Sequence, residues 1–255
     1  MIVETEGVVL HGMNYRDTSK IVTVYTKKFG KVKVIAKGVR SQKNKFGSSL
    51  EPMTIASLVF YKKEHKDLHL VSKSEIANVL NNVQLNPDRI FTGLALIELV
   101  NMVMHDEEEN AKVYELLVQS LKAVNQAEKN HLNVLLSFMV KLFGELGFGM
   151  NLGECSACQK RVDDLNVPHL FLRLSDGKIT CSNCADAQHS SGTKINSGMW
   201  KSLYFLQSSQ IEKSAALTLP SATKNDIIAT LESYLRYHVE GSRTLKSLSM
   251  LYSTQ

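Results

Sequence analysis

Gly30-Lys-Val-Lys-Val-Ile-Ala-Lys-Gly-Val-Arg40 is the stretch that decides the first part of the fold. Successive side chains of a strand point to opposite faces of the sheet. One face of this stretch is apolar and contains Val32, Val34 and Ala36. The other face is basic and contains Lys31, Lys33 and Lys37. The alternation predicts a strand that buries its apolar face and exposes its lysines.

Four more short β-rich runs flank this strand within residues 1–80. With it, they cover residues 7–15, 20–26, 31–39, 53–62 and 67–73. Turn signals such as Phe29-Gly30 and Glu51-Pro52 separate the runs. Five short strands in one small domain predict a closed barrel, and the five-stranded barrel common among nucleic-acid binders is the OB-fold.

The charge of the chain is concentrated in this predicted barrel. Residues 1–80 hold 14 Lys and Arg residues against 7 Asp and Glu residues, although the whole chain has a formal net charge of only +5. Positions 18–50 contain no acidic residue. Such a stretch favours a polyanionic partner, above all nucleic acid. The alternative is a merely soluble strand, because lysine also protects edge strands from pairing.

Two aromatic residues, Phe29 and Phe46, border the basic strand and the basic loop that follows it. Aromatic side chains of single-strand binders stack on bases. A place in the core or in a turn is the interpretation that we favour for both.

After residue 85 the apolar period becomes helical. Asn86-Pro87 predicts an N-cap and a first helical residue, and apolar stripes follow around residues 90–104, 113–124 and 132–143. Helical patterning returns at residues 199–206 and 227–235, with a last short helix near residues 245–252. The short acidic run at residues 106–109 is interpreted as a solvated turn.

All four cysteines fall into two CxxC pairs, Cys155-Ser-Ala-Cys158 and Cys181-Ser-Asn-Cys184, with 22 residues between the pairs. Two such knuckles supply the four thiolates of a closed, tetrahedral, structural zinc site. Two redox-active pairs or two disulfides are the alternatives. The chain begins with acidic rather than secretory sequence, so we expect a reducing cytoplasm, where structural disulfides are rare.

The predicted fold class is therefore α+β and multidomain. We expect an OB-fold domain over residues 1–80, a helical domain over residues 81–150 and 191–255, and a zinc module inserted at residues 151–190. No apolar run approaches the length of a membrane span.

An enzymatic function is disfavoured by the motifs. His105-Asp-Glu107 and His238-Val-Glu240 fit half of a zinc-deaminase signature, but neither cysteine pair is preceded by the required proline. The sequence also contains neither a phosphate-binding Gly-Lys-Ser/Thr loop nor a nucleophile elbow.

Three stretches carry a family resemblance. They resemble the bacterial RecO family of DNA repair proteins. The stretches are residues 30–40 with the following loop and Leu50-Glu-Pro52, residues Tyr15 to Thr26, and the tail Tyr237-His-Val-Glu-Gly-Ser-Arg-Thr-Leu-Lys-Ser247. The order of barrel, helices, four-cysteine module and further helices extends the resemblance over the whole chain. Zinc cysteines are present in only some branches of that family.

This resemblance implies a recombination mediator of the cytoplasm and nucleoid. It would bind single- and double-stranded DNA, anneal complementary strands, act with RecR, contact the acidic C-terminal tail of single-strand-binding protein, and help to load RecA. The residues that we assign to DNA are Lys31, Lys33, Lys37, Arg40, Lys43 and Lys45, with Arg243 and Lys246 added from the tail. An RNA-binding or transcription-associated zinc protein with the same barrel is the alternative, as is a pure scaffold.

Overall fold

The computed structural model describes residues 1–188 and 192–253. The chain forms two compact units, Met1–Gln126 with Leu245–Gln255, and Ala127–Thr244. The predicted domain boundaries at residues 80, 150 and 190 stay predictions. Within the described ranges, no helix is both long and apolar enough to cross a membrane.

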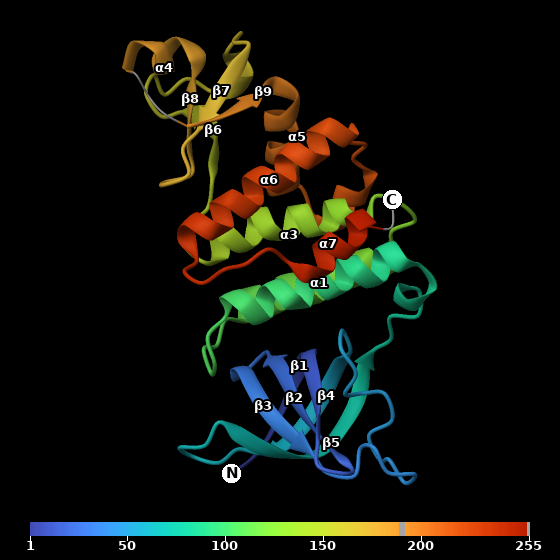
Figure 1. The fold of residues 1–255 in the computed structure, drawn as a ribbon. Coiled ribbons are helices and arrows are strands. Elements are labelled where there is room, and N and C mark those ends of the chain that lie inside the picture. Colours follow the sequence, from blue (N-terminus) through green and yellow to red (C-terminus); the bar gives the residue numbers. More distant parts are fainter. Residues whose placement is uncertain (189–191, 254–255) are drawn as a thin grey trace. The chain divides into compact units, whose positions relative to one another are not determined.

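The first unit begins with a closed five-stranded barrel in the order β1-β2-β3-β5-β4 (Figure 1), which confirms the OB-fold prediction. Its strands are β1 (Ile2–Tyr15), β2 (Ser19–Thr26), β3 (Gly30–Ala36), β4 (Ile55–Tyr61) and β5 (Leu68–Asn78). Neighbours are antiparallel except β3 and β5, whose short parallel pairing closes the barrel.

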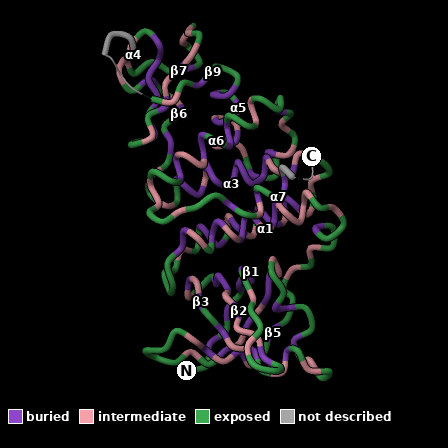
Figure 2. The backbone as a smooth tube through the Cα atoms, viewed as in Figure 1, coloured by how far each residue is buried: buried purple, intermediate pink, exposed green. Residues whose placement is uncertain are grey.

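Alternation along the strands builds the barrel core. Val32, Val34 and Ala36 are buried as predicted, and they pack with apolar residues of the other strands, including the fully buried Phe60. In Figure 2 the tube of the barrel strands carries buried positions interspersed with intermediate and exposed ones.

Helices complete the first unit: η1 (Val83–Leu85), α1 (Pro87–Val103), α2 (Ala111–Gln126) and α7 (Lys246–Ser253). The predicted start of α1 is confirmed, because the Asn86 side chain accepts a hydrogen bond from the Asp88 backbone N–H at 2.8 Å. α7 lies along α1 (Figure 1), and the Glu98 carboxylate accepts hydrogen bonds from the backbone N–H groups of Lys246 and Ser247, each at 3.0 Å. A carboxylate at a helix N-terminus satisfies N–H groups that lack partners within the helix.

The second unit is built on α3 (His131–Glu145), α5 (Ser197–Ser208), η3 (Ile211–Ala216) and α6 (Ser221–His238). α3 is apolar on nearly every side and is the buried centre of this unit, in contact with the other three. Gly147, with a φ of +89°, follows the end of this helix as predicted.

Between α3 and α5 the chain forms a small sheet with strand order β6-β8-β7-β9. Its elements are β6 (Asn151–Cys155), η2 (Val162–Asp164), β7 (His169–Leu172), β8 (Lys178–Cys181), α4 (Ser182–Gln188) and β9 (Thr193–Asn196). The Trp200 side chain of α5 donates a hydrogen bond to the Leu152 carbonyl of β6 at 2.8 Å. This bond joins the sheet to the helices of its unit.

A substitution at Gly30 can test how tightly the turn after α1 packs on the barrel. Its φ is +60°, and a Cβ at this position would fall on the backbone of Glu108. Gly47 has a similar φ of +55°, but a Cβ there would meet nothing within 4 Å. We therefore expect Gly47→Ala to lower the free energy of unfolding by about 1 kcal/mol from backbone strain alone, and Gly30→Ala to lower it by about 3 kcal/mol or more.

Urea unfolding of the two variants measures this difference. Equal losses would show that the turn moves away from the barrel at little cost.

Candidate metal centre and nucleic-acid interface

The four cysteines converge from separate parts of the small sheet. Cys155 ends β6, Cys158 lies in the following turn, Cys181 ends β8, and Cys184 lies in α4. Their four sulfur atoms all lie within 4.8 Å of one another. Zinc–sulfur bonds of about 2.3 Å in a tetrahedron require sulfur atoms about 3.8 Å apart. The four sulfurs therefore fit a tetrahedral metal ion of the zinc class.

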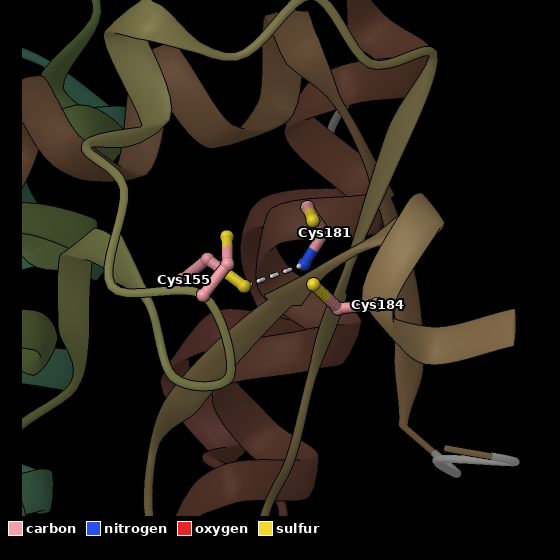
Figure 3. Close-up of side chains that lie close together, drawn as sticks. Cys155, Cys181 and Cys184 are labelled. Carbon is pink, nitrogen blue, oxygen red and sulfur yellow. Dashed lines mark hydrogen bonds between the residues drawn. The ribbon is translucent and has the colours of Figure 1, made fainter. Parts of the chain in front are cut away.

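Local backbone structure brings the two knuckles together. β6 and β8 are parallel neighbours, and both strands end at their cysteine. The backbone N–H of Cys181 donates to the Cys155 sulfur at 3.3 Å, and Figure 3 shows this bond where the Cys155, Cys181 and Cys184 side chains gather. The first knuckle turns back through Gln159, whose φ is +60°.

The electrostatics of the cluster suit a cation. Burial raises the pKa of the Cys155 thiol, but backbone N–H groups of Cys158, Cys181 and Ala157 lower it to about 6 in total. The thiol of Cys184, which is hydrogen-bonded to Cys181, has a pKa raised to about 12. The protein thus stabilises one thiolate by itself, and a divalent ion would stabilise the others. All four cysteines are free thiols rather than disulfides.

The basic strand of the barrel does not present all of its lysines freely. The Lys33 ammonium lies 2.8 Å from Asp106 Oδ2, and the Lys31 ammonium lies 3.4 Å from Asp106 Oδ1. Lys31 also donates to the Asn101 carbonyl at 3.0 Å, and its side chain is only 13% exposed. The hydrogen bond from Lys33 lowers the pKa of Asp106, so this carboxyl stays ionised at neutral pH.

A second carboxylate of the same turn contacts the β4–β5 side of the barrel. Glu107 Oε2 lies 3.1 Å from the Lys62 ammonium, and its other oxygen lies 3.3 Å from Nε2 of the buried His69. The hydrogen bond from Lys62 lowers the pKa of Glu107. The backbone N–H of Glu107 also donates to the Lys31 carbonyl at 2.9 Å. The acidic turn, residues 106–109, is exposed as predicted, but its first two residues also attach it to the basic face of the barrel.

The basic loop, residues 37–45, differs from the strand. Its basic side chains are exposed: Lys37, Arg40, Lys43 and Lys45. None of the ion pairs found among residues 1–188 and 192–253 involves them. The Arg40 guanidinium donates to the Arg16 carbonyl at 3.3 Å, and the Lys45 ammonium lies 5.0 Å from the centre of the Phe46 ring.

The two aromatic residues belong to the barrel, as we favoured. Phe46 is 4% exposed and lies in the barrel core. Phe29 packs against that core and meets Phe60 edge to face, with ring centres 5.9 Å apart. Phe46 is therefore too buried to stack on a base, and the half-buried Phe29 has the Lys62 ammonium 5.3 Å from its ring centre.

Comparison with known sequences matches the two parts of the chain to one family. Residues 1–80 match the family model described as "Recombination protein O N terminal", and residues 84–249 match "Recombination protein O C terminal". The chain belongs to the RecO family.

Curated relatives named "DNA repair protein RecO" agree over nearly full length. The protein of Chloroherpeton thalassium is 28% identical over 97% of this chain and 96% of its own. The protein of Clostridium perfringens is 27% identical over 98% of this chain and 97% of its own. RecO family membership places the chain in DNA repair and recombination.

The tail residues taken from the RecO resemblance lie far from the basic loop in the sequence. Arg243 is exposed in the segment between α6 and α7, and Lys246 is exposed at the first position of α7. The backbone of Lys246 has a structural role through Glu98. Their contact with DNA stays a prediction.

One further basic segment was given no role in the sequence analysis. The β4–β5 loop, Lys62-Lys-Glu-His-Lys-Asp67, places Lys63, His65 and Lys66 in the same hollow as Lys37. A basic loop between two predicted strands was the available signal. Glu64 and Asp67 masked it, because they bring the net charge of the loop close to zero.

The metal centre gives a direct test. We expect the purified chain to hold one zinc ion, and Cys155→Ser or Cys184→Ser to lose it because three thiolates bind far more weakly than four. Loss of the structural metal site lowers the free energy of unfolding by several kcal/mol. The Tm should therefore fall by roughly 10 °C, at about 2–4 °C per kcal/mol.

Ser156→Ala is the matched control for this test, since Ser156 lies in the same knuckle and its hydroxyl contacts Thr180 rather than the sulfurs. Two disulfides by mass spectrometry, or a Cys155→Ser variant that keeps both its metal and its Tm, would contradict a structural zinc site.

Proposed function

We propose that this RecO family protein binds single- and double-stranded DNA through its basic loop, residues 37–45, and promotes annealing of complementary strands. The observation that carries the proposal is the group of exposed basic side chains on this loop, next to a barrel of the OB class. In this proposal the chain binds rather than catalyses, and it acts with RecR and single-strand-binding protein to help load RecA.

Annealing follows from the physics of this surface. Two complementary strands repel each other through their phosphates, and a dense array of cations lowers that repulsion without reading the bases. Lys37, Lys43 and Lys45 are long, flexible point charges, which suit phosphates in many orientations. The zinc would hold the small sheet together and take no part in binding or chemistry, because a four-thiolate site leaves no open coordination position.

The acidic turn divides the assigned lysines into two classes. Asp106 already neutralises much of the charge of Lys31 and Lys33. A phosphate would have to compete with this carboxylate for either ammonium. We therefore propose that Lys37 and Lys43 contribute more to DNA affinity than Lys31 and Lys33 do.

This ranking predicts different salt dependences. Lys37→Ala or Lys43→Ala should weaken binding to unrelated DNA sequences about equally, and each lost contact should lower the log–log salt slope by roughly 0.7 to 0.9. Lys33→Ala should change the slope much less, whereas Asp106→Asn should strengthen binding by releasing Lys31 and Lys33. Fluorescence anisotropy over a series of salt concentrations measures all of these variants.

If the salt slope does not change in Lys37→Ala and Lys43→Ala, the basic loop does not contact phosphates and contributes only to solubility. A larger loss in Lys33→Ala than in Lys37→Ala would contradict the role given to the acidic turn. Tight binding only to RNA, abolished by replacing 2′-hydroxyl groups, would favour the RNA-binding alternative.

For the acidic tail of single-strand-binding protein we propose a cleft in the second unit. It has a volume of about 290 Å³ and a mixed polar and apolar lining, in which Leu165 and Val167 are half-buried and Val162, Leu170 and Trp200 are buried. The exposed Lys201 is among its lining residues. A site of this kind can hold an apolar side chain beside a carboxylate. Asp163 also lines the cleft, and its carboxylate lies 3.5 Å from the Arg161 guanidinium, which offsets its charge.

The cleft predicts a selective effect of one lysine. Lys201→Ala in the full chain should weaken binding of a labelled acidic tail peptide about 5- to 10-fold, in keeping with loss of one charge-assisted contact of about 1–1.5 kcal/mol. Lys178→Ala, an exposed lysine of β8 outside the cleft, is the control and should bind normally. Equal binding by both variants would exclude this cleft.

A further inference from the structure

The hollow beside the closure of the barrel has a lining that neither the core nor the basic loop explains. It is lined by the end of β3, the β4–β5 loop and the start of β5, and its volume is about 540 Å³. That size lies within the range of small-ligand sites. All of these elements belong to the first unit.

The floor of the hollow is apolar. Ile35, Leu68 and Leu70 line it, and each is only half-buried. Ile35 pairs with Leu70 across the parallel β3–β5 contact, while the buried Val34 and His69 next to them face the interior. The three floor residues therefore point outward, on a face where a barrel needs no apolar side chains.

The rim of the hollow is basic and exposed. Lys37, Lys63, His65 and Lys66 line it, against one acidic lining residue, Asp67. Within residues 1–188 and 192–253, no ion pair engages any of the three lysines. The rim lysines can therefore bind an anion without breaking an existing ion pair. Lys31 and Lys33, by contrast, are already paired with Asp106.

The loop that carries this rim is anchored at its start, Lys62 and Lys63. The Lys62 backbone N–H donates to the Met1 carbonyl at 2.9 Å, and the Lys63 backbone N–H donates to Nδ1 of His69 at 3.4 Å. His69 is itself held between the Phe60 ring and Glu107. Anchoring of this kind lowers the entropic cost of ordering the lysines around a ligand.

An apolar floor within a basic rim matches one nucleotide whose base has left its stack. The base or sugar would lie on Ile35, Leu68 and Leu70, and the flanking phosphates would contact the rim lysines. A base inside a duplex is paired and stacked, so it cannot reach the floor. We propose that this hollow holds an unstacked nucleotide of single-stranded DNA and so makes the chain prefer single strands to duplex. The proposal rests on the DNA binding proposed above and adds to it a site that discriminates between the two forms.

Two kinds of variant of the full chain test this site. Ile35→Thr keeps a β-branched residue in β3 but makes the floor polar, and should weaken binding to oligo(dT) roughly fivefold. Its salt slope and its binding to a duplex of the same length should not change. The rim variant Lys63→Ala/Lys66→Ala should lower the salt slope for oligo(dT) by about 1.4 if both lysines contact phosphate, with a smaller effect on duplex.

The control is Lys73→Ala, an exposed lysine of β5 that lies outside the hollow and 2.9 Å from Glu75. It should bind both DNA forms normally. Circular dichroism and Tm check that every variant is folded.

The outcomes separate this proposal from the one on which it rests. If Lys43→Ala weakens both DNA forms while the floor and rim variants change neither, the DNA-binding function stands and the hollow is excluded. Equal losses for oligo(dT) and duplex in the floor variant would also overturn the proposal. If the floor and rim variants no longer bind an acidic peptide but still bind DNA normally, the hollow is a binding site for that peptide and not for DNA. If the wild-type chain binds no DNA, both proposals fail.

Discussion

The short parallel pairing between β3 and β5 is the contact on which the arrangement of the proposed DNA surface depends. It spans only the pairs Lys33 with Leu68, Val34 with His69 and Ile35 with Leu70. The pairing closes the barrel, so every one of its five strands has a partner on both sides. It also brings the end of β3 beside the loop that precedes β5. Two basic segments far apart in sequence thereby line one hollow, together with outward-facing apolar residues that the core does not require.

Charge in this RecO family protein is organised by contacts more than by composition. An acid-free run over residues 18–50 suggests a uniformly positive surface. In the folded chain the carboxylates of Asp106 and Glu107 lie on the barrel surface and form ion pairs with Lys31, Lys33 and Lys62. The pKa values of both carboxyls are lowered, so their ion pairs persist at neutral pH and weaken only as the pH falls through those lowered values. At neutral pH the freely available positive charge therefore lies on the two loops rather than on the strand.

The four-cysteine sheet illustrates a different constraint. Its strands are four or five residues long, and a sheet that small buries little apolar surface of its own. Its few buried apolar side chains include Leu170, Leu172 and Ile179. A metal held by four thiolates would reinforce this small core by cross-linking β6, β8 and α4. The hydrogen bond from Trp200 to the Leu152 carbonyl then fixes the sheet to α5. In this arrangement the knuckles contribute to stability, and the surface chemistry of the unit is left to side chains such as Lys201.

Local patterns determined much of this protein from the sequence alone. Period-two alternation located Val32, Val34 and Ala36 in the core, Asn86-Pro87 located the start of α1, and the two CxxC spacings brought four sulfurs to one point. Each of these depends on residues close in sequence, or on a motif whose geometry is nearly independent of context. The four short strands around the cysteines were not predicted, because four or five residues are too few for a periodic signal. Only the tertiary structure decided that Asp106 would neutralise Lys33 and that Lys37 would share a hollow with Lys63 and Lys66. These contacts join residues far apart in the chain. Electrostatic interaction depends on distance through space, which an unfolded sequence does not contain.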